Sequence, residues 1–460
     1  MTVLAPYEEM IRSALPQAVS GRVASLRGLT LLVDALPMPV GATVSVEARV
    51  GGRVLGEVVG FSREQAVVML YGASSGIRAG DRVRGLSLDP VAPLSPFMLG
   101  RTVNGLGEPI DGLGPIADRS PRRLDAPPIG AMERGPVDRP IETGVRAIDL
   151  MTTLGRGQRL GILAGPGVGK STLLGTLAQR SSADVNVIAL IGERGREVRE
   201  FLERSLGPSG LARSVVVVAT GDEPPLLRIR AAWLACAIAE QYRDIGRDVL
   251  LMMDSITRFA HAQRQVGLSV GEPPATKGYT PSVFAQLPVL LERAGPSEKT
   301  GGSVTGLYTV LVEGDDMTEP VADAAKGILD GHLVLSRKLA QRGHYPAVDV
   351  LSSVSRVADE IVDEHHRTAR NLVRRLLASY ADIEELVQIG AYAKGSDPES
   401  DVAVAYQPRL MDLLRQDAGE ASTMAEARDW MIRLAMESGE VLRRLREGVL
   451  DQPQSPAAGG

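Results

Sequence analysis

The segment 159–172, RLGILAGPGVGKST, constrains the fold of this chain more than any other. Its apolar beginning predicts a short buried strand over 159–164, and the residues from Lys170 onward predict a helix. The loop between strand and helix is rich in glycine. Backbone N–H groups can close around a polyphosphate only where side chains are absent. The segment therefore predicts a strand, a phosphate-binding loop and a helix in direct succession.

Each part of this loop has its own chemistry. Lys170 offers a mobile positive charge to the β and γ phosphates, and Ser171 offers a hydroxyl ligand to Mg²⁺. The helix that follows presents its positive end to the anion. The strict motif has glycine at position 164, where this chain has alanine, and we expect this small change to be tolerated. The candidate contacts to the nucleotide phosphates are Gly165, Pro166, Gly167, Val168, Gly169, Lys170, Ser171 and Thr172.

Length and composition favour a soluble protein of two or three domains. The chain has 460 residues, of which 44% are hydrophobic and 23% charged. Its one cysteine, Cys236, cannot form an intramolecular disulfide, which fits a reducing compartment. We find neither a signal peptide nor a membrane-spanning run, so we expect a cytoplasmic or peripheral protein. A net charge of −5 argues against broad non-specific binding to nucleic acid.

The pattern of the first part of the chain predicts a small β-barrel. Residues 1–18 contain a short helix-like segment that is too short to be stable alone. Over 19–90, short β-branched runs alternate with Gly and Pro, which is typical of a closed or partly closed antiparallel barrel. The chain up to residue 90 has only three aromatic residues, Tyr7, Phe61 and Tyr71. Binding of single-stranded RNA, which needs stacking platforms, is therefore not expected.

The middle of the chain, 91–355, is expected to form the nucleotide-binding domain. Residues 91–158 are rich in Pro and Gly, which predicts a long connection with little regular structure that wraps this domain. From 159 onward, unbroken apolar strands alternate with helices, which indicates a parallel sheet covered on both faces.

The end of the chain is expected to be helical. The apolar period becomes helical over 356–450, which predicts a helical bundle. Residues 451–460 lack apolar periodicity and are expected to be disordered. The predicted fold class is thus an α/β multidomain protein.

Two carboxylates are candidates for the catalytic site. Asp254 ends an apolar strand, where it could hold Mg²⁺, although it could also cap the next turn. The next residue, Ser255, cannot act as a base, so the base must come from elsewhere. Glu193 ends the strand that follows the loop helix, and in a sheet where that strand lies beside 159–164 it could face the γ-phosphate. Its alternatives are an ion pair with a neighbouring arginine and a helix N-terminal position.

The roles of two further side chains depend on contacts with a neighbouring subunit or with the nucleotide base. Arg356 could reach the γ-phosphate of a neighbouring subunit if the protein forms a ring, whereas the alternative is a solvated or ion-paired residue at the start of a helix. Tyr345 could stack on an adenine base, and its alternative is a half-buried tyrosine in a loop.

The longer motifs of the chain are AGPGVGKST, IGERGREVREF, LLMMDSITRFAHAQR, GEPPATKGYTPSVFAQLPVLLERAG, DGHLVLSR and YPAVDVLSSVSR. Taken together, they carry a family resemblance over about residues 19 to 450. The chain resembles the catalytic subunits of rotary ATPases, and among them the hexameric export ATPases of the bacterial flagellum and of type III secretion. The ending IGAYAKGSDPESD followed by LLRQ resembles the flagellar enzymes more than the virulence enzymes.

The resemblance implies roles for the candidate residues. Residues 165–172 match the family's P-loop for ATP, and Glu193 matches its catalytic glutamate. Asp254 matches its Walker B aspartate for Mg²⁺, Tyr345 its adenine-side tyrosine and Arg356 its arginine finger. The implied fold has an N-terminal barrel, a RecA-like core and a C-terminal helical domain.

The resemblance also implies an assembly and its partners. The family forms homohexamers and works in the cytoplasm, peripheral to the inner membrane export apparatus. Implied partners are a stator-like regulator at the short N-terminal segment 1–18, a central-stalk-like coiled-coil protein, the export gate, and export chaperones with their cargo. The alternatives that we weigh are a virulence-type secretion ATPase, a non-catalytic subunit of a rotary ATP synthase and an RNA translocase.

Overall fold

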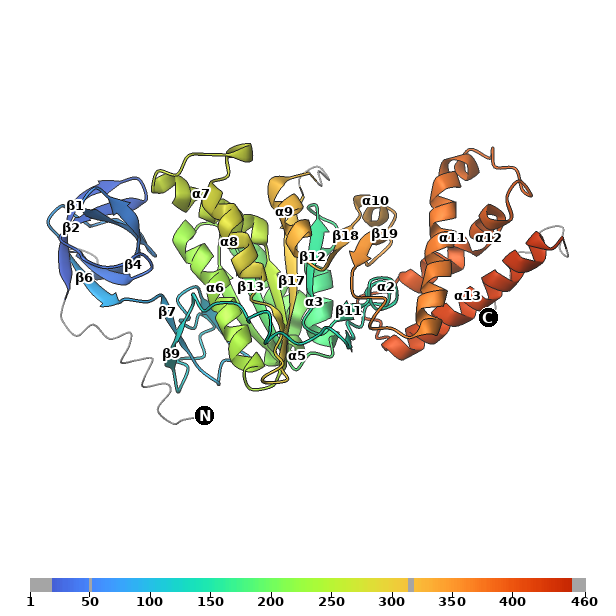
Figure 1. Cartoon of the computed structure of the whole chain (residues 1–460), viewed down its shortest axis with the longest axis horizontal. Helices are drawn as coiled ribbons and strands as arrows, with labels where there is room; N and C mark the ends of the chain where they lie inside the picture. Colours follow the sequence, from blue (N-terminus) through green and yellow to red (C-terminus); the bar gives the residue numbers. More distant parts are fainter. Residues whose placement is uncertain (1–18, 49–51, 313–317, 449–460) are drawn as a thin grey trace.

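The protein consists of three parts that lie in a row (Figure 1). The computed structural model describes residues 19–48, 52–312 and 318–448, so the predictions for 1–18 and 451–460 fall outside the described residues. A barrel, a central sheet covered by helices and a group of C-terminal helices follow one another along the chain. This arrangement confirms the predicted fold class.

The first part is a closed antiparallel barrel of six strands in the order β1-β2-β5-β4-β3-β6. Its inward positions are filled by aliphatic side chains, and Val44, Val46 and Val58 have no exposed surface. β-Branched residues at alternating positions pack well on a pleated surface, which explains why this stretch forms strands. The strands are β1 (Ser20–Arg27), β2 (Thr30–Asp34), β3 (Thr43–Ala48), β4 (Gly52–Ser62), β5 (Gln65–Leu70) and β6 (Arg82–Ser87).

The connection after the barrel has more regular structure than its composition suggests. β8 pairs in parallel with β14 at one edge of the central sheet, so this connection contributes a strand to the core. Strands of three or four residues between Pro and Gly residues are difficult to predict, because hydrophobic periodicity can be recognised only over longer runs. Its elements are β7 (Val91–Leu94), β8 (Thr102–Asn104), β9 (Ser120–Arg123), β10 (Pro140–Ile141), α2 (Arg146–Met151) and β11 (Leu154–Gly155).

The central sheet has the strand order β19-β18-β12-β17-β15-β13-β14-β8, with β16 paired to β17 outside this path. Strands β18, β12, β17, β15, β13, β14 and β8 are parallel, whereas β19 and β16 run antiparallel to their neighbours. Strand bounds are β12 (Arg159–Ala164), β13 (Val185–Ile191), β14 (Ser214–Ala219), β15 (Asp248–Asp254), β16 (Gly295–Pro296), β17 (Ser303–Leu311), β18 (Gly331–Leu335) and β19 (Val348–Ser355).

Helices cover both faces of this sheet and divide the core into two clusters. One cluster packs α6, α7, α8 and α9 on one face, and the other packs α2, α3 and the C-terminal helices on the opposite face. The helices are α3 (Lys170–Arg180), α4 (Gly195–Glu200), α5 (Gly207–Ala212), α6 (Pro225–Arg243), α7 (Ile256–Ser269), α8 (Pro281–Leu291), α9 (Pro320–Ile328) and α10 (Arg337–Gln341). A π-helical turn over Phe201–Leu206 joins α4 to α5, and a 3-10 turn over Thr276–Gly278 precedes α8.

The C-terminal part consists of three helices, α11 (Glu364–Gln388), α12 (Pro398–Leu414) and α13 (Met424–Arg446). Each begins at a side chain that accepts a hydrogen bond from a first-turn N–H group: Asp363, Asp397 and Thr423. The strand β19 ends at Ser355 and α11 begins only at Glu364, so Arg356 follows a strand. The expectation that Arg356 starts a helix was wrong.

The parallel strands β12, β13 and β15 end at one edge of the sheet, and this edge carries the predicted site. In parallel sheets covered by helices, ligands bind at the carboxyl ends of the strands.

None of the helices in the described residues combines the length and the apolar composition that a membrane span requires.

Candidate functional site

The predicted phosphate-binding loop lies between β12 and α3, as the sequence indicates. Gly167 and Gly169 have φ values of 77° and 87°, in the left-handed region that favours glycine. An added Cβ at Gly169 would lie in van der Waals contact with the Tyr345 ring, at 3.4 Å, so the loop and this ring are close neighbours. Val168 turns inward and is 2% exposed. Ala164, at the position where the strict motif has glycine, is buried at the end of β12.

Lys170, Glu193 and Asp254 come together from three separate elements. The Lys170 Nζ atom lies 2.5 Å from Asp254 Oδ1 and 3.7 Å from Glu193 Oε1. Asp254 also accepts a hydrogen bond of 2.6 Å from Thr309 Oγ1, on the neighbouring strand β17. Both carboxylate residues are buried, at 8% and 4% exposure. One ammonium group therefore faces two carboxylates at the strand ends.

Glu193 reaches this cluster by a route that the sequence reasoning did not foresee. Its strand β13 does not lie beside β12, because β17 and β15 separate the two strands. The chain bends at Gly192, with φ 71°, after β13 has ended. Glu193 thus comes within 3.7 Å of Lys170, although its strand does not lie beside β12, which was the arrangement that the prediction required.

The surroundings of Glu193 favour its protonated form. Burial raises the pKa of Glu193 to about 7, and the negative charge of Asp254 adds to this, while Lys170 and Arg258 act in the opposite direction. Arg258 Nε lies 3.4 Å from Glu193 Oε1, and its guanidinium donates to the Gly192 carbonyl. A carboxyl group with a pKa near 7 can exchange a proton with water near neutral pH.

Arg258 and Thr309 were missed by the sequence reasoning. Arg258 lies in the first turn of α7, four residues after Asp254, so one turn of helix brings it back to the strand end. That spacing was available as a signal. Thr309 carries no local signal, because its contact depends on the pairing of β17 with β15.

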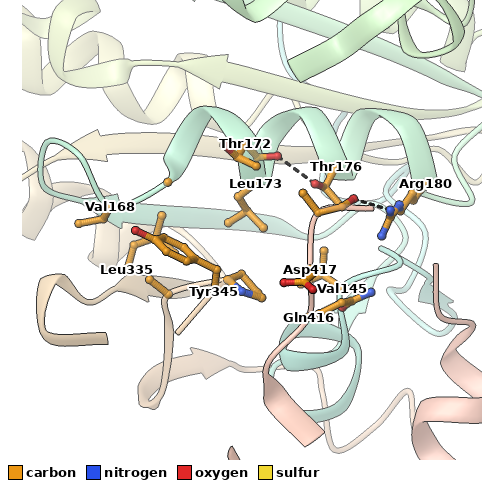
Figure 2. Close-up of a pocket in the computed structure, with 14 residues that line it drawn as sticks. Val145, Val168, Thr172, Leu173, Thr176, Arg180, Leu335, Tyr345, Gln416 and Asp417 are labelled. Carbon is orange, nitrogen blue, oxygen red and sulfur yellow. Dashed lines mark hydrogen bonds between the residues drawn. The ribbon is translucent and has the colours of Figure 1, made fainter. Parts of the chain in front are cut away.

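Tyr345 borders a cavity of about 320 Å³ beside the phosphate-binding loop (Figure 2). Its side chain packs against Gly169, and the residue is 44% exposed. The far wall of the cavity comes from the connection between α12 and α13, in the C-terminal part of the chain. The lining residues are Val145, Val168, Gly169, Thr172, Leu173, Thr176, Arg180, Leu335, Tyr345, Pro346, Ala347, Gln416, Asp417 and Ala418.

This cavity continues directly from the loop that would hold phosphates. Val168, Gly169 and Thr172 belong both to the candidate phosphate contacts and to its lining. A flat ring at Tyr345, together with apolar side chains such as Val145, Val168 and Leu173 in the lining, suits a purine base. The contribution of 416–418 was missed, because nothing local in the sequence links this segment to the loop.

Ser171 and Thr172 lie exposed in the first turn of α3, next to Lys170. The described residues contain no group of three or more His, Cys, Asp or Glu side chains that could hold a metal ion. A hydroxyl, one carboxylate and phosphate oxygens are instead the donor set that Mg²⁺ uses at nucleotide sites. Ser171 and Asp254 fit that donor set.

Arg356 lies apart from this cluster within its own chain. It is exposed, its backbone N–H donates to Asp330 O at 2.9 Å, and its Nη2 atom donates to Lys326 O at 3.4 Å. Across the described parts of the chain, no hydrogen bond or ion pair joins it to Lys170, Glu193 or Asp254. A single copy therefore brings together the other predicted catalytic residues without Arg356.

Family models match three regions of the chain. The model described as ATP synthase alpha/beta family, nucleotide-binding domain, matches residues 144–355. The beta-barrel domain of the same family matches 38–86, and the T3SS EscN ATPase C-terminal domain matches 362–433.

Several curated proteins are similar over nearly the whole chain. The flagellum-specific ATP synthase of Pseudomonas aeruginosa is 46% identical over 425 residues, covering 92% of this chain and 94% of that protein. The flagellum-specific ATP synthase of Salmonella typhimurium is 49% identical, covering 86% and 89%. The type 3 secretion system ATPase of Xanthomonas euvesicatoria is also 49% identical, covering 87% and 91%.

Solved structures show the same architecture. The assembled ATPase EscN from the type III secretion system of enteropathogenic E. coli matches with a TM-score of 0.85 and 39% identity, covering 90% of this chain and 100% of that chain. EscN in complex with its central stalk EscO matches with a TM-score of 0.83, at the same identity and coverage.

Proposed function

The chain belongs to the ATP synthase alpha/beta family, and we propose that it is the Mg²⁺-dependent ATP hydrolase of a homohexameric ring that energises flagellar type III protein export. Membership of the family makes it a P-loop ATPase. The observation that carries the proposal is the meeting of Lys170, Glu193 and Asp254 at the carboxyl edge of the parallel sheet.

The chemistry assigns a separate task to each of these residues. Lys170 would leave Asp254 and bind the β and γ phosphates, whose charge exceeds that of one carboxylate. Glu193 would orient the attacking water and accept its proton. Ser171 and Asp254 would hold Mg²⁺, which when bound supplies positive charge to the phosphate oxygens. Thr309 holds Asp254 in position through its 2.6 Å hydrogen bond.

Arg356 would complete the site of the neighbouring subunit. Its exposure, and its contact with the Lys326 carbonyl in place of any described contact with Lys170, Glu193 or Asp254, support a role in trans. The likeness to an assembled EscN supports a ring in which such a contact can form. Stabilisation of the negative charge on the γ-phosphate in the transition state would then depend on assembly.

We extend the proposal to partners of the ring. The likeness to EscN bound to its central stalk EscO supports a coiled-coil stalk partner. The C-terminal helices would meet export chaperones and cargo, the N-terminal segment would bind a stator-like regulator, and the ring would work in the cytoplasm against the inner membrane export gate. No nucleic acid is expected as a partner. Binding of single strands needs several exposed aromatic side chains on which bases stack. Of the barrel aromatics in the described residues, Phe61 is exposed, whereas Tyr71 is only 5% exposed and cannot serve as such a platform.

The assignment to flagellar export, and not to a virulence secretion system, is the more specific part of the proposal. Sequence identity alone does not distinguish the two systems, because relatives of both kinds reach 49% identity. The segment 389–401 supports the flagellar machine. A virulence-type secretion ATPase is the alternative with the same chemistry, and a non-catalytic synthase subunit is disfavoured because Glu193 lies within 3.7 Å of Lys170.

Assembly-dependent activity tests the proposed ring. The ATPase rate per chain should rise steeply as concentration passes through the range in which the ring assembles, because a single copy lacks the neighbour's Arg356. Steady-state phosphate release and sedimentation should be measured on the same samples. A rate per chain that stays constant while the oligomer forms would contradict the proposal.

Proteins that co-purify with the chain from its own cells test the flagellar assignment. We expect components of flagellar export, since the ring would be held at that apparatus. Mass spectrometry should be compared with a purification from cells in which flagellar genes are not expressed. Recovery of injectisome components alone would favour the alternative.

A further inference from the structure

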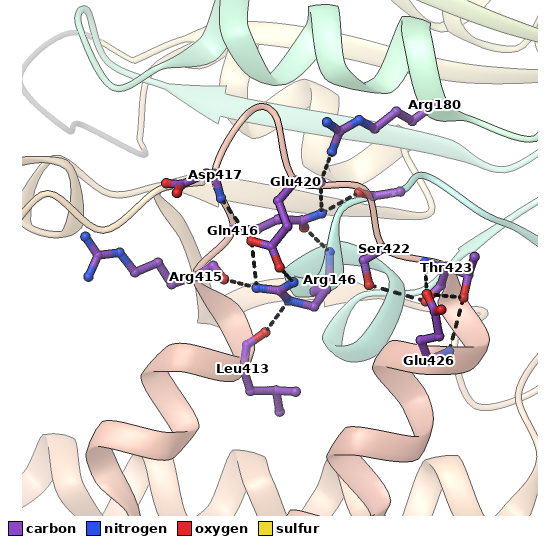
Figure 3. A network of polar contacts seen from close by, with 11 residues as sticks. Arg146, Arg180, Leu413, Arg415, Gln416, Asp417, Glu420, Ser422, Thr423 and Glu426 are labelled. Carbon is purple, nitrogen blue, oxygen red and sulfur yellow. Dashed lines mark hydrogen bonds and ion pairs between the residues drawn. The ribbon is translucent and has the colours of Figure 1, made fainter. Parts of the chain in front are cut away.

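The connection between α12 and α13 reaches across to the predicted nucleotide site (Figure 3). We call residues 415–420 the base-side loop. Gln416, Asp417 and Ala418 line the cavity beside Tyr345, although they belong to the C-terminal helical part. Residues 417–420 are exposed, so burial of their own side chains does not fix the position of this loop.

Gln416 uses its whole amide group to hold the loop in place. Its Oε1 atom accepts from the Arg146 backbone N–H at 2.9 Å, and its Nε2 atom donates to Gly144 O and to Glu420 O, each at 3.0 Å. Its backbone N–H donates to Tyr345 O at 2.8 Å. Gln416 is only 5% exposed. Its side chain therefore holds protein groups and leaves base contacts to its neighbours.

Arg146 holds the same loop from one side. Its Nε atom donates to Leu413 O at 3.0 Å, and its remaining nitrogens bind Arg415 O and the Glu420 carboxylate. Its guanidinium lies 5.3 Å from the centre of the Trp430 ring on α13. An arginine with five donors in a planar fork suits this joining of backbone carbonyls to a carboxylate.

Arg180, at the end of the phosphate-loop helix, holds the loop from the other side. Its guanidinium donates to the carbonyls of Ala418 and Glu420. Its side chain passes close to Gly144, where an added Cβ would lie 2.7 Å from Arg180 Cβ. The loop is thus bound to two helices of the nucleotide domain, to α2 through Arg146 and to α3 through Arg180.

We propose that Gln416 is a positioning residue that, with Arg146 and Glu420, sets the base-side wall of the nucleotide site. The proposal rests on the proposed nucleotide site and deepens it. Phosphate contacts come from 165–172, whereas the base would lie between Tyr345 and the base-side loop. Disturbing Gln416 should therefore weaken the binding of the base and leave the binding of the phosphates intact.

Gln416→Ala tests this separation, since it leaves Gly144 O and the Arg146 N–H without their partner and removes one of the two donors to Glu420 O. We expect the Kd for Mg²⁺-ADP to rise about 10-fold, and the Kd for Mg²⁺-pyrophosphate, which lacks a base, to change less than about 2-fold. Titration calorimetry on the full chain measures both. Turnover at saturating ATP should stay within about 2-fold of the unchanged protein, so the effect should appear in KM.

Two further variants separate positioning from packing. Gln416→Met keeps most of the side-chain volume without the hydrogen bonds, and it should weaken ADP binding as much as Gln416→Ala does. Thr423→Ala breaks the capping box at the start of α13, in the same connection but outside the Gln416 contacts, and it should leave both affinities unchanged. An intact pyrophosphate affinity also shows that a variant has folded.

Either of two results would overturn the proposal: equal weakening of ADP and pyrophosphate by Gln416→Ala, or no weakening of either. Lys170→Ala identifies a failure of the nucleotide site itself. This variant should abolish the binding of both ligands, and if it binds them normally, then the proposed site is wrong independently of Gln416.

Discussion

Glu193→Gln is expected to lower the turnover of ATP by about 10³-fold, because an amide cannot accept the proton of the attacking water. Its shape is close to that of the carboxylate, so the 3.7 Å approach to Lys170 can be kept. The Kd for Mg²⁺-ATP should change little, which would separate chemistry from binding. Single-turnover phosphate release and equilibrium binding should be measured on the same preparation.

Glu200→Gln is the matched control for this substitution. Glu200 is exposed on α4 and pairs with Arg204 at 3.1 Å, away from Lys170. The same chemical change there should leave turnover within about 2-fold of the unchanged protein, since exposed ion pairs contribute little. If Glu193→Gln also kept full turnover, then another group would have to act as the base.

The pH profile of the unchanged protein gives an independent check on Glu193. A pKa raised to about 7 means that the carboxyl group is largely protonated below that pH and ionised above it. A base acts only when ionised, so kcat/KM should fall as pH drops through about 7 and reach a plateau above it. In the Glu193→Gln variant, the residual rate should lose this dependence on pH.

The local motifs made much of the architecture predictable. The loop 165–169 and Lys170 are adjacent in sequence, so predicting their positions requires only one strand, one turn and one helix. Predicting the position of Asp254 requires only that a buried strand ends there. The barrel followed from alternating β-branched runs, which carry their own period. These features depend on contacts that are short in sequence.

What could not be predicted depends on how distant segments pair. The order of the strands puts β17 and β15 between β12 and β13, and no local pattern gives that order. Gln416 meets Arg146 only after the C-terminal helices have packed on α2, because 270 residues separate the two in sequence. The strand β8 joins the sheet from within a stretch rich in Pro and Gly. These parts of the structure are fixed by packing between elements.

Arg356→Ala is expected to lower turnover by about 10³-fold in the assembled protein, since an arginine donated by a neighbour can supply that much rate to phosphoryl transfer. Its side chain lies apart from the cluster of its own chain, so the Kd for Mg²⁺-ATP of a single copy should not change. Arg367→Ala is the matched control. Arg367 is also exposed, and its guanidinium likewise donates to one carbonyl, Asp359 O, at 3.4 Å.

Mixing two inactive variants decides whether Arg356 acts across a subunit boundary. The Glu193→Gln chain lacks a base but still carries the arginine, whereas the Arg356→Ala chain carries the base and lacks the arginine. In a ring that assembles at random from equal amounts, about a quarter of the interfaces join an intact base to an intact arginine. Activity should therefore return on mixing, although each variant alone is nearly inactive. Because a residue acting within its own chain cannot be supplied by a neighbour, a mixture that stays as inactive as its components would assign Arg356 no role across the interface.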